Sequence, residues 1–364
     1  MGFKSFIFFI VDIIKGRGAQ HNTHNKFLQH QHTMLDDFLN YCETESESAD
    51  NNKTSYLEIY PKTILNKVTS PDIGFSYSMN PYQGCEHGCI YCYARNTHEY
   101  WGYSAGLDFE RKILYKVNAP KLLEKKLRSK SWQPQDIMFS GNTDCYQPIE
   151  KKLEITRKML QVLLKLKHPV SMITKNSLIL RDLDILKEMA EMNLVRVSIS
   201  ITSLSEETRR VVEPRTASIK KRLETVQVLS ENGIPVNVMM APIIPSINSH
   251  EILPLVKKVS ELGATSIGYT IVRLNGAIGE IFTNWLRKTY LDRADKILHQ
   301  IEDCHGGSLN DSRYGNRMRG EGKIAEQINM QFKLARKLYL KDKNFPLLDF
   351  SKFDKHQTNQ ISLF

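Results

Sequence analysis

Short apolar runs alternate with helix-length amphipathic segments between residues 75 and 274, and this alternation constrains the fold more than any other feature of the sequence. Residues 151–167 carry apolar side chains three and four positions apart, the pattern of a helix buried on one side. The same pattern recurs at 180–192, 218–231, 250–262 and, without a strand before it, at 280–304. Strands are predicted at 76–80, 136–140, 170–174, 194–200, 235–244 and 266–274.

Repeated strand–helix units predict a parallel sheet with right-handed crossovers. Six units make a partial (β/α)6 barrel of the TIM type, and two further units needed for a closed eight-stranded barrel are not found in the sequence. We therefore expect an α/β core over residues 71–302. An irregular, partly disordered extension is predicted over 1–70, and a basic loop, a helix and a tail over 303–364. Chemistry is expected where the strands end and the following loops begin.

The composition indicates a reducing compartment and an acidic partner. Six cysteines in 364 residues are too few for a disulfide framework, and the apolar stretch at 3–14 is too short for a membrane span. We expect a cytoplasmic protein without a membrane span. The formal net charge of +10 favours nucleic acid or an anionic cofactor as a partner, although a basic enzyme with no such partner is equally compatible with it.

Three cysteines, Cys85, Cys89 and Cys92, lie within eight residues directly after the first predicted strand. The spacing of three and then two residues lets one loop bind three corners of an iron–sulfur cubane, and two neighbouring glycines allow tight turns. Because no fourth cysteine lies nearby, one iron would keep a position open for a small ligand. The competing interpretation is a structural zinc ion with His87 as its fourth ligand.

The pattern Cys-x3-Cys-x2-Cys, with an aromatic residue before the third cysteine, resembles the signature of the radical S-adenosylmethionine (SAM) superfamily. This resemblance implies a 4Fe-4S cluster, SAM bound through its amino and carboxylate groups to the open iron, and an external electron donor. It further implies reductive cleavage of SAM to a 5′-deoxyadenosyl radical that abstracts a substrate hydrogen. DNA is the substrate that we favour, in a repair-like role. The alternatives are a protein or small-metabolite substrate, or a non-catalytic iron–sulfur or zinc protein.

Residues 77–245 also resemble the spore photoproduct lyase branch of that superfamily, with matching residues at successive strand ends. The resemblance gives Tyr91 and Tyr93, beside the last cysteine, a catalytic role. It gives cofactor contacts to Thr143, Asp144, Lys175, Ser198, Arg215 and Met240. Each residue also has a structural interpretation: a surface lysine, a strand hydroxyl satisfied by backbone, an ion-pair partner, or aromatic packing around the loop.

One departure from that branch concerns the hydrogen donor. Where the lyase has its donor cysteine, this chain has Gly141, and Cys145 follows four residues later. Cys145 is therefore a candidate for returning hydrogen to a product radical, or else a small apolar residue of the core. Photoproduct repair does not follow from the resemblance.

Two features near the C-terminus suggest DNA. The glycine-rich segment 305–320 carries Arg313, Arg317 and Arg319, a composition suited to phosphates, although a solvated loop is as compatible. The sequence ends in Gln-Ile-Ser-Leu-Phe, which resembles the bacterial sliding-clamp-binding motif through Gln360, Leu363 and Phe364. An apolar tail docked on its own domain is the alternative.

Overall fold

A twisted, mainly parallel sheet forms the centre of the computed structural model, which describes residues 13–28 and 53–357. The strand order is β10-β9-β8-β7-β6-β3-β2, and every neighbouring pair is parallel except β2 with β3. The edge strands β10 and β2 are not paired with each other, so the sheet stays open. The strands are β2 (Leu65–Lys67), β3 (Tyr77–Met79), β6 (Ile137–Phe139), β7 (Val170–Thr174), β8 (Val195–Ser200), β9 (Val236–Ile243) and β10 (Ser266–Ile271).

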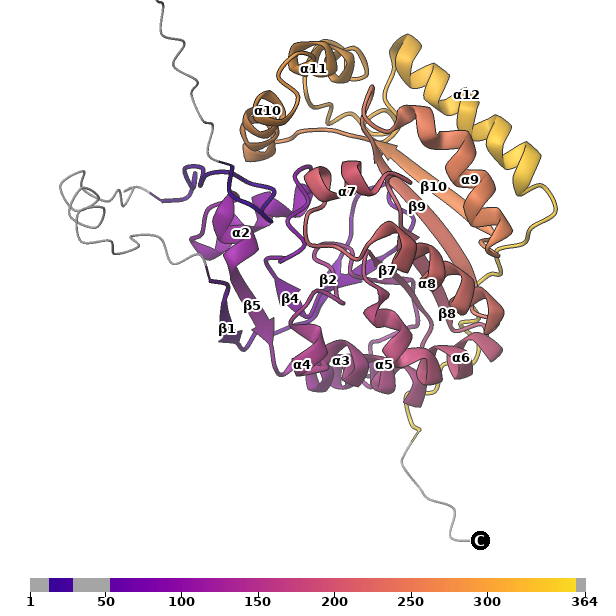
Figure 1. Ribbon diagram of the computed structural model, residues 1–364. Coiled ribbons are helices and arrows are strands. Elements are labelled where there is room, and N and C mark those ends of the chain that lie inside the picture. The colour runs from indigo at the N-terminus through magenta and orange to yellow at the C-terminus, as the bar shows by residue number, and fades with distance from the viewer. Residues whose placement is uncertain (1–12, 29–52, 358–364) are drawn as a thin grey trace, which may run out of the picture.

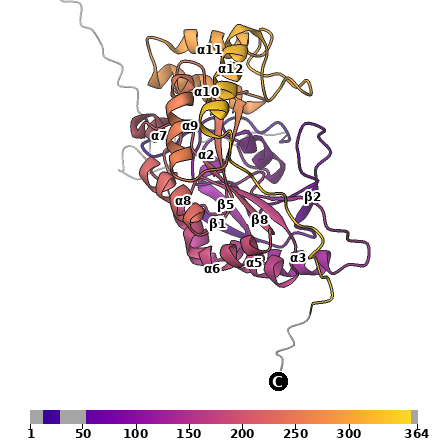
Figure 2. The same ribbon diagram turned by 90° about the vertical axis from the view of Figure 1, so that its right-hand side faces the viewer.

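Helices cover the outer face of this sheet, as Figure 1 shows along its lower and right-hand sides and Figure 2 shows from the side. They are α3 (Ala119–Leu127), α4 (Glu150–Leu153), α5 (Ile155–Lys165), α6 (Leu183–Glu191), α8 (Ile219–Glu231), α9 (Ile252–Glu261) and α12 (Gly322–Tyr339). Burial alternates along β7, β8 and β10, and the fully buried side chains join apolar residues of these helices in the main core. The less buried side chains point to the inner face of the sheet.

The sequence located all six parallel strands to within three residues at each end, and the run 170–174 coincides with β7. The parallel α/β architecture is therefore confirmed. One expectation was wrong: the helical pattern at 280–304 forms two helices, α10 (Ala277–Thr289) and α11 (Ala294–Asp303). The chain turns at Tyr290, whose ring packs edge-on against Trp285 and lies under Arg293. Both helices thereby place apolar faces in a second core.

Three short strands form a second sheet with the order β1-β5-β4, and its strand β4 follows β3 of the main sheet directly in the chain. Its strands are β1 (Ser55–Ile59), β4 (Tyr82–Gln83) and β5 (Lys112–Lys116). Both β1 and β2 lie in the stretch expected to be irregular, so its described part is tied to the core by strand pairing. The remaining elements are α2 (Leu107–Arg111), α7 (Glu206–Val212) and the 3-10 helices η1 (Tyr93–Trp101), η2 (Ser177–Asp182) and η3 (Ser249–Glu251).

The C-terminal part packs onto β10 of the main sheet and onto α9. Helix α12 stacks Phe332 against Tyr269 of β10, with ring centroids 4.0 Å apart and the planes within 2° of parallel. The chain then runs back past the amino-terminal ends of β7 and β8. Asp349 N donates to Asn193 O (2.9 Å) there, and Asp354 N donates to Leu166 O (3.0 Å). Within the described residues, no helix is both long enough and apolar enough to cross a bilayer.

Replacing Phe332 with alanine should lower the free energy of unfolding by about 3–5 kcal/mol, because it removes a fully buried ring from the contact between α12 and β10. Met330, 59% exposed on the same helix, provides the control, and Met330→Ala should change it by less than about 0.5 kcal/mol. Denaturant unfolding measures both values. Equal effects would show that α12 is not an integral part of the core.

Candidate functional site

The three-cysteine loop follows β4 of the small sheet and leads into η1, and it is fixed through its backbone. Cys85 N donates to Phe109 O (2.8 Å), and Cys92 N donates to Cys89 O (3.3 Å). Gly84 and Gly88 adopt left-handed backbone angles, with φ of +78° and +67°. A Cβ on Gly88 would lie 2.8 Å from Glu110 Oε2, so glycine is required there for the loop to pack as it does.

The thiols of this loop have the chemistry of cluster ligands. Burial raises the pKa of Cys89 well above its ordinary value and also raises that of Cys92, and the neighbouring thiols add to both shifts. A bound metal cluster would supply the positive charge that stabilises the thiolates. Within the described residues, no three His, Cys, Asp or Glu side chains are gathered around one point as a single metal ion requires. Thiolates on a cubane bind separate irons, so the loop suits a cluster better than zinc.

The loop is joined to two strand ends through a buried histidine. His87 Nδ1 faces Asp144 Oδ2 at 3.3 Å, and His87 Nε2 lies 3.4 Å from Asn176 Nδ2. Burial lowers the pKa of His87, but Asp144 and Cys85 more than offset this and raise it to about 10. Burial raises the pKa of Asp144, but the contact with His87 and other hydrogen bonds lower it to about 2. His87 is thus engaged in an ion pair, not free as the fourth ligand of a zinc ion.

Lys175 follows β7, and its ammonium group has no hydrogen-bonded partner among the described residues. Its Nζ lies 5.9 Å from the centre of the Tyr91 ring, and in the described part of the chain it makes neither a hydrogen bond nor an ion pair. Burial lowers the pKa of Lys175, but the nearby Cys89, Glu213 and Asp144 raise it above the ordinary value. A half-buried cation in this position is suited to an anionic ligand beside the cysteine loop.

Glu213 is the buried carboxylate that organises this side of the site. It accepts a hydrogen bond from the Tyr91 hydroxyl and pairs with Arg222, whose Nη2 lies 2.7 Å from Glu213 Oε2. Arg222 Nη1 in turn donates to Ser200 O at the end of β8 (3.0 Å). The network therefore connects the cysteine loop to a third strand end.

The other predicted cofactor residues have different surroundings. The Thr143 hydroxyl donates to Tyr82 O (2.7 Å), and Asp144 accepts from Thr174 Oγ1 (2.7 Å) and Lys175 N (2.8 Å), so both side chains hold the backbone. Ser198 faces the inner side of the sheet, where it accepts from Asn237 Nδ2 (3.0 Å). Arg215 pairs with Glu86 at 3.3 Å. Met240 is fully buried in the main core, so only its backbone is available to a ligand.

The candidates for hydrogen transfer differ sharply in accessibility. The Tyr93 side chain is 53% exposed, and its hydroxyl donates to the carbonyl of Gly141. Cys145 is fully buried in the main core, where burial raises the pKa of its thiol well above the ordinary value. The Tyr93 hydroxyl therefore lies at Gly141, whereas the Cys145 thiol is enclosed in the main core.

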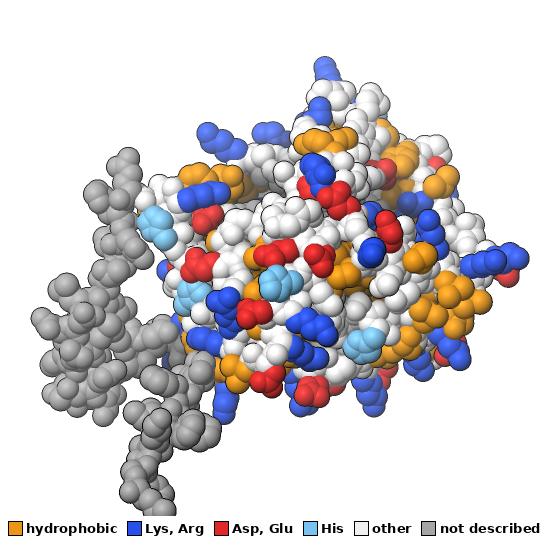
Figure 3. All heavy atoms as spheres, turned by 90° about the horizontal axis from the view of Figure 1, so that it is seen from above, with side chains coloured by type: hydrophobic (Ala, Val, Ile, Leu, Met, Phe, Trp, Pro, Cys, Tyr) orange, Lys and Arg blue, Asp and Glu red, His pale blue; other side chains and the backbone are white. Residues whose placement is uncertain are grey.

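The arginines of the C-terminal loop are engaged within the chain. Arg313 pairs with Asp311 (2.7 Å) and Glu321 (2.6 Å), Arg317 Nε donates to Asp72 (2.6 Å), and Arg319 lies 4.2 Å from the centre of the Tyr269 ring. On the face shown in Figure 3, lysine and arginine side chains are interspersed with acidic ones. The net charge of +10 is not gathered into one patch on that face. The motif at Gln360, Leu363 and Phe364 lies outside the described residues.

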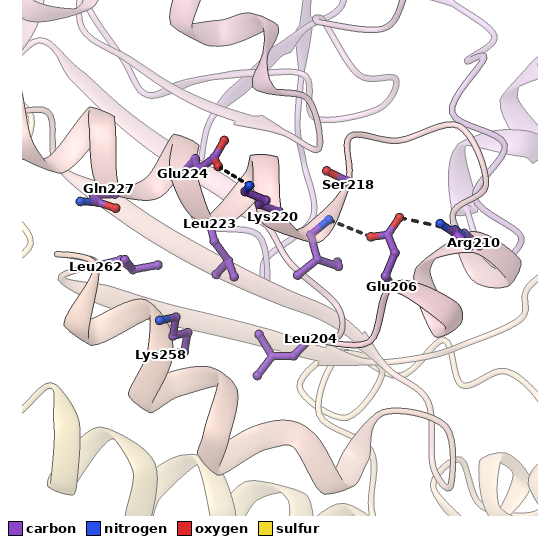
Figure 4. Close-up of a pocket in the computed structure, with 11 residues that line it drawn as sticks. Leu204, Glu206, Arg210, Ser218, Lys220, Leu223, Glu224, Gln227, Lys258 and Leu262 are labelled. Carbon is purple, nitrogen blue, oxygen red and sulfur yellow. Dashed lines mark hydrogen bonds and ion pairs between the residues drawn. The ribbon is translucent and has the colours of Figure 1, made fainter.

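A hollow on the outer surface lies between α7, α8 and α9 and is lined by Leu204, Leu223 and Leu262 together with charged side chains (Figure 4). Glu206 there pairs with Arg210 (3.8 Å), and Lys220 pairs with Glu224 (3.9 Å). None of its lining residues belongs to the cysteine loop or to the ends of β6 and β7. The hollow is therefore separate from the candidate site.

The sequence and the fold of this chain are similar to those of known proteins. Residues 79–259 match the family described as the radical SAM superfamily. An uncharacterised protein of Mycobacterium tuberculosis (strain ATCC 25618 / H37Rv) is 31% identical over 239 residues, 65% of this chain and 70% of that protein. An uncharacterised protein of Methanocaldococcus jannaschii is 29% identical over 241 residues, 66% of this chain and 85% of that protein.

Among solved structures, spore photoproduct lyase complexed with dinucleoside spore photoproduct has a similar fold. The TM-score is 0.59 at 17% identity, over 79% of this chain and 81% of the lyase. A variant of that lyase with bound AdoMet gives the same TM-score at 16% identity, also over 79% of this chain and 81% of the variant. The chain belongs to the radical SAM superfamily. It is a radical SAM enzyme, and its cofactors are a 4Fe-4S cluster and SAM.

Sequence reasoning missed the residues that hold the site together. His87 was considered only as a zinc ligand, and neither Glu213 nor Arg222 was identified as a site residue. Glu213 lies directly before a proline, between the strand predicted at 194–200 and the helix predicted at 218–231, and this position was the available signal for a turn after the strand. The pairing with Arg222 depends on a fold in which both side chains are buried.

We expect Glu213→Gln to lower the free energy of unfolding by about 3–5 kcal/mol, because the buried Arg222 would lose its anionic partner. Tyr91→Phe removes one hydrogen bond to the same carboxylate and should cost about 1 kcal/mol. Denaturant unfolding of the cluster-free protein under reducing conditions compares the two. A Glu213→Gln effect no larger than that of Tyr91→Phe would contradict the central role of this ion pair.

Proposed function

We propose that Cys85, Cys89 and Cys92 hold the cluster and that Lys175 binds the carboxylate of SAM beside it. The observation that carries this assignment is the Lys175 ammonium, which lies near Cys89 and Tyr91 and has no hydrogen-bonded or ion-paired partner in the part of the chain that the structure describes. When bound, the cluster and SAM together supply a 5′-deoxyadenosyl radical for hydrogen abstraction, with an electron from an external donor.

The residues around Lys175 would help to orient the cluster and SAM. Glu213 and Arg222 fix Tyr91, whose ring forms a wall next to Lys175. Asp144 holds the backbone N–H of Lys175 and so fixes where the lysine side chain begins. On the inner face, Ser198 offers a hydroxyl to the adenosine part of SAM. Arg215, paired with Glu86, and the Met240 backbone would line the edge of the same site.

We also propose that Tyr93 carries the hydrogen-transfer role assigned to the tyrosines beside the last cysteine. Its exposed phenol is held at the Gly141 carbonyl, where the lyase branch carries a cysteine, whereas Tyr91 is 8% exposed and bound to Glu213. Cys145 remains a weaker candidate, because a substrate could reach its thiol only if the main core opened.

Anaerobic reconstitution followed by reduction with SAM present should yield 5′-deoxyadenosine. Cys85→Ala should abolish both the visible absorbance of the cluster and this product, whereas Cys304→Ala, in the main core, should retain both. Lys175→Gln should keep the iron content but raise the Kd for SAM several-fold, and Lys220→Gln, 86% exposed, should not. Wild-type cluster content in Cys85→Ala, or unchanged SAM affinity in Lys175→Gln, would overturn the assignment.

DNA is the substrate class that we propose, in a repair-like reaction. The support is the fold shared with spore photoproduct lyase, solved with a dinucleoside photoproduct, together with the net charge of +10. Arg313 (56% exposed) and Arg317 (14% exposed) are both paired with acidic side chains, so these two arginines are expected to contribute little to phosphate binding. Recruitment by a sliding clamp through Gln360, Leu363 and Phe364 belongs to the same proposal.

We expect single- and double-stranded oligonucleotides to bind with an affinity that falls as salt rises, and to increase the yield of 5′-deoxyadenosine. Fluorescence anisotropy across a salt series and product assays measure the two effects. No binding at low salt and no change in yield would exclude DNA and favour a protein or small-metabolite substrate. Removing residues 360–364 should abolish binding to a bacterial clamp without changing DNA affinity.

A further inference from the structure

A short N-terminal segment, residues 17–25, crosses the backbone of the cysteine loop at Gly88, and we call it the strap. Figure 1 shows it in indigo against α2. The strap is close to the loop at Gly18, where a Cβ would overlap with the carbonyl oxygen of Gly88. Because the obstacle is backbone, which cannot rotate away, only glycine permits this approach.

One buried carboxylate fastens the strap to the loop. Glu110 accepts hydrogen bonds from Gly18 N (3.2 Å) and Ala19 N (2.8 Å), and it pairs with Arg95 at 2.6 Å. Arg95 donates through Nε (3.1 Å) and Nη2 (3.0 Å) to Cys89 O. The side chains of Arg95 and Glu110 are both fully buried, so two charges hold the strap and the cysteine loop in one hydrogen-bonded unit.

A second crossing holds the far end of the strap. A Cβ on Gly106 would overlap with the carbonyl oxygen of His21, and Leu107 N donates to that oxygen (3.3 Å). Thr23 N donates to Ser104 Oγ (2.7 Å), and Asn25 Nδ2 donates to Glu99 O (2.8 Å). These hydrogen bonds run along the whole strap, so its position is fixed at both ends.

We propose that the strap is a positioning element that holds the cysteine loop in its cluster-binding shape and limits access of oxygen to the cluster. The proposal rests on the assignment of Cys85, Cys89 and Cys92 as cluster ligands. Cys89 is only 6% exposed, and Ala19 of the strap packs in the same core as Cys89. Displacing the strap exposes the loop backbone and frees Glu110 and Arg95.

The test compares three glycine variants of the full-length protein after anaerobic reconstitution. Gly18→Ala and Gly106→Ala each block one strap crossing, whereas Gly74→Ala is the control, because a Cβ there meets nothing within 4 Å. On exposure to air, cluster absorbance should decay several-fold faster in both strap variants than in wild type and Gly74→Ala. Limited proteolysis should cut the strap variants first near the N-terminus.

Thermal unfolding of the cluster-free variants separates a displaced strap from a failure to fold. Faster cluster decay with a melting temperature close to that of Gly74→Ala supports the proposal. Wild-type decay in both strap variants overturns it, as does faster decay that only follows global unfolding. A wild-type protein that binds no iron would instead overturn the cluster assignment, and iron analysis before the air exposure identifies that case.

Discussion

The buried ion pair between Arg95 and Glu110 is the interaction on which the site's architecture depends. Two charges without solvent contact are tolerated only when nearly every donor and acceptor is satisfied, and here the guanidinium donates to Cys89, Ala105 and Gly106 carbonyls as well as to Glu110. The carboxylate receives two backbone N–H groups of the N-terminal segment. Chain segments far apart in sequence thus meet at one point behind the cysteines.

A second set of charged groups lies at the carboxyl ends of the parallel strands, near the cysteine loop. The ends of β6, β7 and β8 lie side by side, which brings Asp144, Lys175 and the carbonyl of Ser200 to one edge of the sheet. Asp144 is matched by His87, and Glu213 is matched by Arg222. Of His87, Arg222 and Lys175, Lys175 alone lacks a hydrogen-bonded partner in the described part of the chain. Its unpaired positive charge is therefore suited to an anionic ligand.

The three arginines of the segment 305–320 interact mainly within the chain. Arg313 and Arg317 are each paired with acidic side chains, and Arg319 donates to a backbone carbonyl beneath it. These arginines fasten the loop to the end of β10 and to the segment around Asp72. A basic composition in a loop is therefore compatible with a structural role, because ion pairing within the chain removes charge that would otherwise be available to phosphates.

The sequence by itself determined the strands and the cysteine loop, because both depend on neighbours along the chain. Apolar alternation defines β7 and β8 whatever lies beside them, and the spacing of Cys85, Cys89 and Cys92 is a local property. Only the tertiary structure decided that the pattern at 280–304 breaks at Tyr290, that Met240 faces the core, and that Gly18 crosses over Gly88. Each of these depends on residues far apart in sequence: α10 and α11 share the second core with Ile90 and Val212, and Met240 belongs to the main core. The crossing of Gly18 over Gly88 is possible only when both segments are in place.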